Sequence, residues 1–215
     1  MEDRYYFDYE REMLYDKKED IFIAVIWPTA IKYEREIIQM INEFSDIYLY
    51  DKECITIKRE NLLWIMYWIY HFDWIPQKIV EEKCKVISQA IKGETIEMIF
   101  LKLYSKDKKY TTNAHNNRKQ ATITSLIKYK VRQAIKEKID NYVHDIIVHI
   151  TDDGNQSYAL IELIVFLRIL NNNDNLIAGY DYDGRYLKIR LCQKIASIDE
   201  IKNDWLVIEA GENGR

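Results

Sequence analysis

Residues 21–27 read IFIAVIW, a short apolar run rich in β-branched residues that predicts a buried β-strand. Pro28 ends the run, and Thr29 can cap the element that follows. From Ala30 to Phe44, apolar residues recur near helical spacing, which predicts an amphipathic helix. A buried strand followed by a helix therefore opens the fold.

The same alternation of strand and helix continues along the chain. Two β-α-β halves in this order are the pattern of a ferredoxin-like βαββαβ α+β sandwich with an antiparallel sheet. The later expected elements are strands at 47–57, 94–104 and 142–151, helices at 58–70, 77–91, 121–139 and 157–170, a polar basic loop at 105–119, a turn at 152–155 and a hairpin at 179–191.

The length of 215 residues fits one domain with attached segments. With 48% hydrophobic and 31% charged residues, the composition is that of a globular protein. The chain has only 2 Pro and 6 Gly, which are too few to form a flexible linker. We expect an acidic, aromatic extension at 1–20, a domain at 21–170, and a C-terminal hairpin and tail at 171–215.

Cysteine usage and hydropathy bear on the compartment. Cys54, Cys84 and Cys192 show no CxxC spacing, which disfavours a disulfide scaffold or a zinc ribbon and favours a reducing compartment. The charged start MEDRYYFDYEREML is unlike a signal peptide. No apolar run approaches the ~20 residues of a membrane span. We expect a cytoplasmic protein that is not bound to a membrane.

Positive charge is concentrated in one stretch of an otherwise acidic chain. Residues 102–138 carry eleven Lys or Arg against Asp107 and Glu137, a balance of +9, so a net charge of −4 leaves −13 for the rest. Such a block indicates an anion site for phosphate, nucleotide or nucleic acid, or else a solvated helix face. Within it, spacing of four places Lys128, Arg132 and Lys136 on one helix face, where Arg132 could hold phosphate bidentately.

Two further features could carry chemistry. The loop HNNRK at 115–119 offers a guanidinium near a helix N-terminus, where anions are favoured. His144 and His149 lie five apart on one expected strand and so on opposite faces, which argues against a shared metal. A histidine beside a carboxylate can be a nucleophile or base, or a structural residue with ordinary hydrogen bonds. No glycine-rich phosphate loop, GxSxG or HExxH is present, and we expect no metal held by protein ligands alone.

Taken in order, several segments between residues 21 and 170 resemble the nucleoside diphosphate kinase family. FIAVIWPTAIKY resembles its first strand, proline and helix, and KYKVRQAI its arginine-bearing segment. DIIVHITDD resembles the catalytic strand, in which a histidine is followed two residues later by Ser or Thr and then by Asp. SYALIELIVFL resembles the next helix, and DWLVIEAG a C-terminal segment.

The resemblance implies a kinase, a transferase that passes a phosphoryl group from ATP or another nucleoside triphosphate through a phosphohistidine. It implies Mg²⁺ bound with the nucleotide, and a homo-oligomer. Carried over residue by residue, it implies His149 as the phosphate acceptor, Glu162 as the group that orients it, Thr151 and Asp152 in the adjoining turn, Arg118 and Arg132 as phosphate contacts, Thr122 or Thr124 as the nearby threonine, Tyr70 as the aromatic behind the histidine and Trp74 as the ring that stacks on the base.

Three departures from the family pattern keep other functions open. The family's lysine before the first proline is Trp27, its asparagine before the histidine is Ile146, and its glycine after the histidine is Ile150. Loss of a positioned cation slows such catalysis ~10²–10³-fold. One alternative is a catalytically degenerate relative that binds a nucleotide or a protein. Another is a nucleic-acid-binding protein that uses residues 102–138, although the acidic chain disfavours a large footprint.

Overall fold

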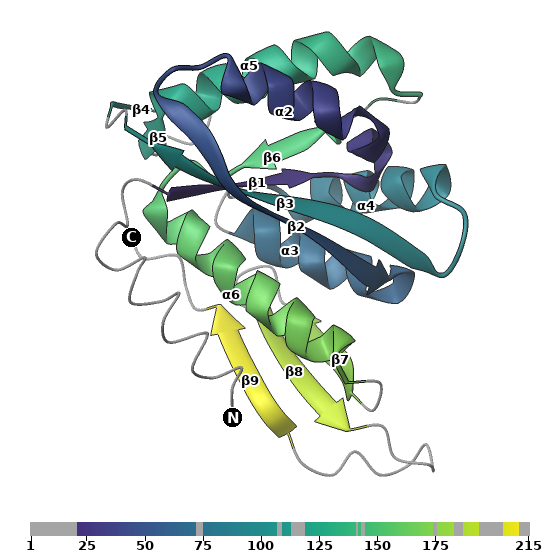
Figure 1. Cartoon of the computed structure of the whole chain (residues 1–215). Helices are drawn as coiled ribbons and strands as arrows, with labels where there is room; N and C mark the ends of the chain where they lie inside the picture. The colour runs from purple at the N-terminus through teal and green to yellow at the C-terminus, as the bar shows by residue number, and fades with distance from the viewer. Residues whose placement is uncertain are drawn as a thin grey trace.

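The computed structural model describes residues 21–71, 75–106, 109–112, 119–140, 142, 145–173, 176–182, 187–193 and 204–210. These residues form a mixed α+β structure in which helices cover both faces of a central sheet (Figure 1). Within the described residues, no helix is both long enough and apolar enough to cross a membrane.

The central sheet has four antiparallel strands. They are β1 (Ile21–Ile26), β2 (Ile47–Lys58), β3 (Thr95–Ser105) and β6 (Val148–Ile150), in the order β2-β3-β1-β6. β1 lies in the middle with all six residues buried, as its apolar β-branched sequence predicts. The prediction that the first strand and the histidine strand share one antiparallel sheet is confirmed, since Val25 lies opposite His149.

Helices pack on each face of the sheet through separate apolar clusters. The 3₁₀ turn η1 (Pro28–Tyr33), α2 (Glu34–Asn42) and α5 (Thr122–Ile135) cover one face. On the other face lie α3 (Leu62–His71), α4 (Gln77–Ala90) and α6 (Gly154–Asn171). The helices expected at 30–44 and 157–170 therefore both pack on the sheet, but on opposite faces (Figure 1). Short 3₁₀ turns precede α3 (η2, Arg59–Asn61) and follow α5 (η3, Lys136–Lys138).

A second sheet extends the core beyond α3. It contains β7 (Leu176–Tyr182), β8 (Leu187–Gln193) and β9 (Asp204–Ala210), all antiparallel. The ring of Tyr182 stacks on Tyr67 of α3 with centroids 4.4 Å apart. This packing explains why α3 is apolar on all sides, with nine of its ten residues buried. The hairpin prediction holds for the pairing of β7 with β8, whereas β9 was not predicted.

Three local predictions need correction. The strand expected at 142–151 is only Val148–Ile150, because Asp145 adopts a left-handed conformation with φ of 60° and interrupts it. The expected loop at 105–119 contains β4 (Tyr110–Thr112), which pairs with β5 (Lys119–Ala121). The turn at 152–155 is the start of α6, where the Asp153 carboxylate accepts hydrogen bonds from the N–H groups of Asn155 and Gln156.

Candidate functional site around His149

His149 is the middle residue of β6, at the edge of the sheet. Its neighbours Val148 and Ile150 belong to the core under α2 and α5, so strand alternation turns His149 toward α3 on the opposite face. There the edge of its ring meets the ring of Tyr70, with centroids 5.3 Å apart. Only 3% of His149 is exposed. The predicted proximity of Tyr70 and His149 is confirmed, but the histidine does not face an open cleft.

Lys83 of α4 completes the far side of this cluster. Its ammonium donates a hydrogen bond of 2.9 Å to the Tyr70 hydroxyl and lies 4.1 Å from the centre of the same ring. Lys83 itself is 4% exposed. The sequence analysis missed this residue, although a signal exists: Lys83 lies three positions after Val80 and four before Ile87, on the apolar face of the helix.

Trp27 also packs on Tyr70. The two rings stack with centroids 5.8 Å apart and planes within 19°. The backbone N–H of Trp27 donates to the Ile147 carbonyl at 3.1 Å, which places the indole where β1 ends beside β6. The lysine that the resemblance calls for is thus replaced by a fully buried ring packed against the neighbour of His149.

The indole N–H of Trp27 differs from those of two nearby tryptophans. Trp64 Nε1 donates to Asn61 at 3.0 Å, and Trp68 Nε1 donates to the Ala159 carbonyl at 2.8 Å. In the described part of the chain, Trp27 Nε1 is buried without a hydrogen-bond partner. A buried donor left without a partner destabilises a fold by ~1–3 kcal/mol. Trp27 therefore fills space at this point without satisfying its polar atom.

Electrostatics keep the histidine neutral. Burial lowers the pKa of His149 well below 6.5, and the positive charges of Lys128, Lys83 and Arg132 lower it further. A neutral imidazole is the form that a nucleophile requires. The protonation state therefore suits phosphate transfer, whereas the burial of the ring opposes access by a substrate.

Arg132 uses its guanidinium to hold the start of β6. Two of its nitrogens donate to the Val148 carbonyl, the shorter bond being 3.1 Å, and a third lies 3.1 Å from the Asp145 carboxylate. Tyr142 donates to the same carboxylate at 2.7 Å. Arg132, the predicted phosphate contact, is therefore bound to Asp145, the residue with positive φ.

The turn after the histidine is a buried hydrogen-bond network. The Thr151 hydroxyl accepts from the N–H of Ile23 at 3.0 Å and lies 2.8 Å from the Ser157 hydroxyl. The Asp152 carboxylate forms an ion pair with Lys128 and accepts from Gln120 at 2.7 Å. These bonds connect β6 to β1, α5 and α6. Thr151 and Asp152, which match the family motif, therefore stabilise the fold.

Several other cations of the basic stretch on α5 and η3 also meet carboxylates. Lys130 pairs with Glu43, Lys138 lies 2.5 Å from Glu36, and Lys136 lies 4.0 Å from Glu137. A solvated helix face was one of the two interpretations of this block, and the partly exposed ion pairs of Lys136 and Lys138 fit it. Anion binding by the stretch as a whole stays a prediction.

The remaining predicted residues lie on α5, on α6 or outside the described part of the chain. Thr124 is fully buried, and its hydroxyl donates to the carbonyl of Ala121, the residue before α5, at 3.0 Å. Glu162 lies partly buried on α6, and its role as the group that orients His149 stays a prediction. Trp74, Arg118 and His144 lie outside the described residues. Within those that are described, no group of three His, Cys, Asp or Glu could hold a metal ion.

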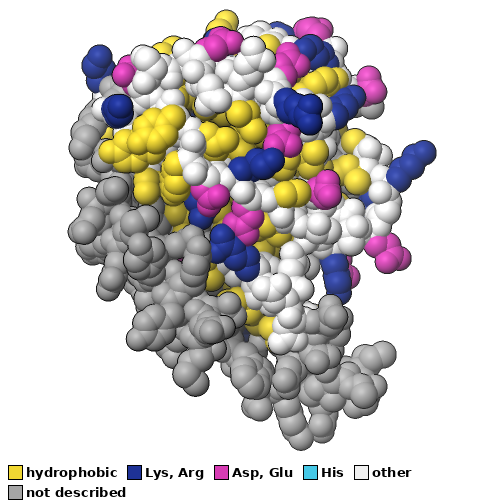
Figure 2. All heavy atoms as spheres, in the orientation of Figure 1, with side chains coloured by type: hydrophobic (Ala, Val, Ile, Leu, Met, Phe, Trp, Pro, Cys, Tyr) yellow, Lys and Arg dark blue, Asp and Glu magenta, His cyan; other side chains and the backbone are white. Residues whose placement is uncertain are grey.

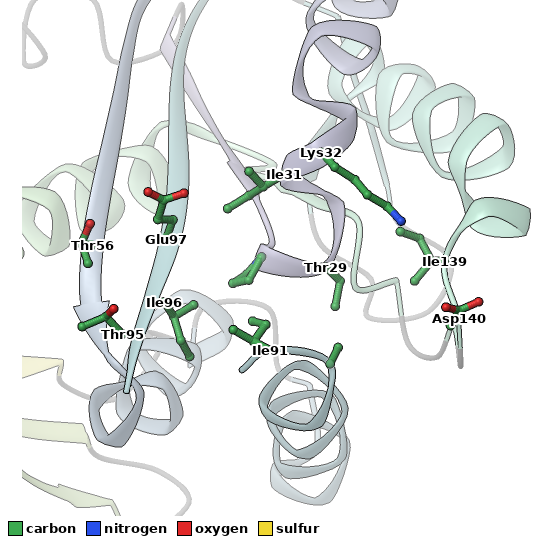
Figure 3. A pocket seen from close by; sticks show the side chains of 12 residues that line it. Thr29, Ile31, Lys32, Thr56, Ile91, Thr95, Ile96, Glu97, Ile139 and Asp140 are labelled. Carbon is green, nitrogen blue, oxygen red and sulfur yellow. The ribbon is translucent and has the colours of Figure 1, made fainter. Parts of the chain in front are cut away.

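An open cavity lies beyond the end of β1, beside the cluster (Figure 3). Its volume is about 790 Å³. Ile31, Ile91 and Ile96 point into it from three elements, and Lys32 and Asp140 lie toward one side (Figure 3). Thr29 also lines it and donates its hydroxyl hydrogen to the Ile146 carbonyl. His149 is not among the lining residues, so this opening does not expose the imidazole.

Comparisons with known proteins add no family assignment. No protein-family model matches the chain, and a search among curated proteins finds no match.

Proposed function

We propose that the chain is a catalytically degenerate relative of the nucleoside diphosphate kinases with a ferredoxin-like core. The strand order β2-β3-β1-β6 and the crossover helices α2 and α5 support the ferredoxin-like assignment. Support for the family comes from the histidine on the last strand of that sheet, the aromatic ring of Tyr70 beside it, and the Thr-Asp turn after it.

The proposed loss of activity is inferred from the burial of His149. A phosphohistidine enzyme needs the imidazole within hydrogen-bonding reach of the transferred phosphoryl group, with cations free to offset its charge. Here His149 is 3% exposed, Trp27 and Tyr70 pack beside it, and Arg132 is bound to backbone and carboxylate oxygens. On this proposal the protein binds a nucleotide or a protein and does not transfer a phosphoryl group.

A second candidate is an active phosphotransferase, and one observation favours it. His149 is held neutral among Lys83, Lys128 and Arg132, whose charges would stabilise a phosphoryl group on the ring. This candidate requires the Trp27 ring to move away whenever a nucleotide enters.

Incubation with γ-labelled ATP and Mg²⁺, followed by an acid-lability test, separates the two. The degenerate relative gives no acid-labile label, whether or not His149 is present. The active enzyme gives a label that His149→Ala abolishes and His144→Ala leaves. Acid-labile label on His149 in the wild type would overturn the degenerate assignment.

A second reagent tests closure without depending on nucleotide binding. Phosphoramidate transfers its phosphoryl group to an exposed imidazole: the ring nitrogen attacks phosphorus, the P–N bond breaks and ammonia leaves. Wild-type His149 should resist this reaction, and Trp27→Ala should make it reactive by at least about tenfold, because removing the indole opens the buried site. Equal labelling of His149 in both proteins would show that Trp27 does not close the site.

A further inference from the structure

A group of tyrosines and lysines lies at the end of the central sheet where β2 begins and β3 ends. In Figure 2, hydrophobic side chains gather on the left of the molecule at this end, with Lys and Arg side chains above them. The described residues that form this tyrosine–lysine surface are Tyr48, Tyr50, Tyr104, Lys106, Tyr110 and Lys119.

Tyr48 presents an accessible ring on this surface. It is 43% exposed, pairs across the strands with Tyr104, and lies 5.2 Å from that ring between centroids. The Lys106 ammonium lies 5.9 Å from the centre of the Tyr48 ring. Tyr50 is the extra residue of a β-bulge between Leu49 and Asp51, and it is 45% exposed. Bulges on edge strands reorient side chains, and here the bulge adds a second exposed ring.

The β4–β5 hairpin repeats the combination of cation and ring. The Lys119 ammonium lies 3.9 Å from the centre of the Tyr110 ring, and Lys119 is exposed. Four positions separate Lys106 from Tyr110, so the Cα atoms of these two residues lie within ~14 Å of each other. A flexible polyanion can therefore contact both at once.

The charge balance of this surface differs from that of α5. On α5, Lys128 and Lys130 each pair with a carboxylate. Among the described residues, Lys106 and Lys119 pair with none and lie over tyrosine rings instead. Two carboxylates are exposed nearby. The backbone carbonyl of Asp46 accepts from the N–H of Lys106 at 2.7 Å, and the Asp51 carboxylate lies 3.2 Å from the Lys102 ammonium. The local cations therefore retain charge that a polyanion could neutralise.

We propose that this tyrosine–lysine surface binds single-stranded nucleic acid. Single strands are recognised by exposed aromatic rings on which bases stack, next to cations that contact the phosphates. Half-exposed rings beside unpaired lysines supply both parts, whereas an anionic membrane or an acidic peptide would use the lysines alone. The proposal is independent of His149. It restricts the anion site predicted for residues 102–138 to the end of β3 and the β4–β5 hairpin.

Fluorescence anisotropy of labelled oligothymidine and oligouridine tests the proposal with the full chain. Strands of ~16 nucleotides cover the site sizes of such surfaces. We expect binding that weakens between about 50 and 200 mM salt, and a log–log salt slope about 1.4 shallower in Lys106→Ala/Lys119→Ala. The matched control is Lys130→Ala/Lys138→Ala, which removes the same charge from α5 and η3 and should leave the slope unchanged.

Tyrosine variants test the stacking part. Tyr48→Ala should weaken binding about tenfold, because it removes a ring on which a base can stack. Tyr48→Phe should bind like the wild type, because phenylalanine keeps an aromatic ring at this position. Equal weakening in the two lysine pairs would overturn the localised surface. Heparin binding as tight as oligonucleotide binding, with no effect of Tyr48→Ala, would reduce the surface to a polyanion site. Binding to phosphatidylserine vesicles without oligonucleotide binding would also overturn the proposal.

Discussion

The turn after β6 and the aromatic cluster beside β6 use polar residues in opposite ways. In the turn, the Asp152 carboxylate meets Lys128 and Gln120, so its buried charge is compensated, and the Asp152 backbone N–H donates to the Gln156 side chain of α6. In the cluster, the imidazole of His149 lies against Tyr70, and the indole N–H of Trp27 has no partner within the described residues. One region stabilises through satisfied hydrogen bonds, the other through aromatic packing.

On the proposed function, the difference explains how the sequence motif around His149 can persist in a chain that does not transfer phosphate. Thr151 and Asp152 connect β6 to β1 and α5, so the fold requires them whether or not His149 reacts. For the Trp27 indole no such polar contact is found among the described residues, and its buried ring stacks on Tyr70, the neighbour of His149. Substitutions in the turn should therefore change the free energy of unfolding. Substitutions in the cluster should change the access of reagents to His149 and the pH dependence of stability.

The largest expected effect is the loss of the buried ion pair in the turn. Lys128→Met leaves the Asp152 carboxylate buried beside an apolar side chain, and it should lower the free energy of unfolding by ~3–5 kcal/mol. Urea denaturation followed by circular dichroism measures the change.

A matched substitution lies two residues away on the same helix. Lys130→Met removes an exposed ion pair with Glu43 and should change stability by less than ~1 kcal/mol. Similar losses in the two variants would mean that Asp152 is not held as a buried charge.

The second effect is a pH dependence arising from the cluster. Burial lowers the pKa of His149 in the folded chain, so the unfolded chain binds the proton first as the pH falls. Stability should be unaffected by His149 above its ordinary pKa of 6.5 and should fall below it, with a slope of up to ~1.4 kcal/mol per pH unit.

Urea denaturation at a series of pH values checks this slope. His149→Gln should flatten the decline, because glutamine does not titrate. A slope that is identical in the variant would assign the acid sensitivity to other groups. The charged residues that act on the imidazole are Lys83 from α4 and Lys128 and Arg132 from α5.

Much of this fold could be predicted from periodicity, because each strand and helix has its own apolar pattern. The errors fall where tertiary contacts decide. Asp145 interrupts a strand by adopting positive φ in a position held by Arg132 and Tyr142, and no local pattern encodes that. For the same reason, the order of residues pointed to Tyr70 beside His149, but it could not show that the guanidinium of Arg132 binds backbone oxygens.

The third effect concerns the start of α6. Asp153→Ala removes a side chain that accepts from two free N–H groups of the first turn, and it should lower the free energy of unfolding by ~1 kcal/mol. Asp153→Asn should retain most of that stability, since asparagine caps helices about as well. Equal losses in the two variants would point to the charge rather than the cap.

The smallest effect compares two buried indoles directly. Trp68→Phe removes the N–H that donates to the Ala159 carbonyl, and the loss of this one hydrogen bond adds about 0.5–1.5 kcal/mol to the loss of ring volume. Trp27→Phe removes an N–H that has no partner among the described residues, so only the volume change remains. In urea denaturation, Trp27→Phe should therefore destabilise the protein less than Trp68→Phe does. The reverse order would mean that the Trp27 N–H has a stabilising partner and that the indole does more than fill the space beside Tyr70.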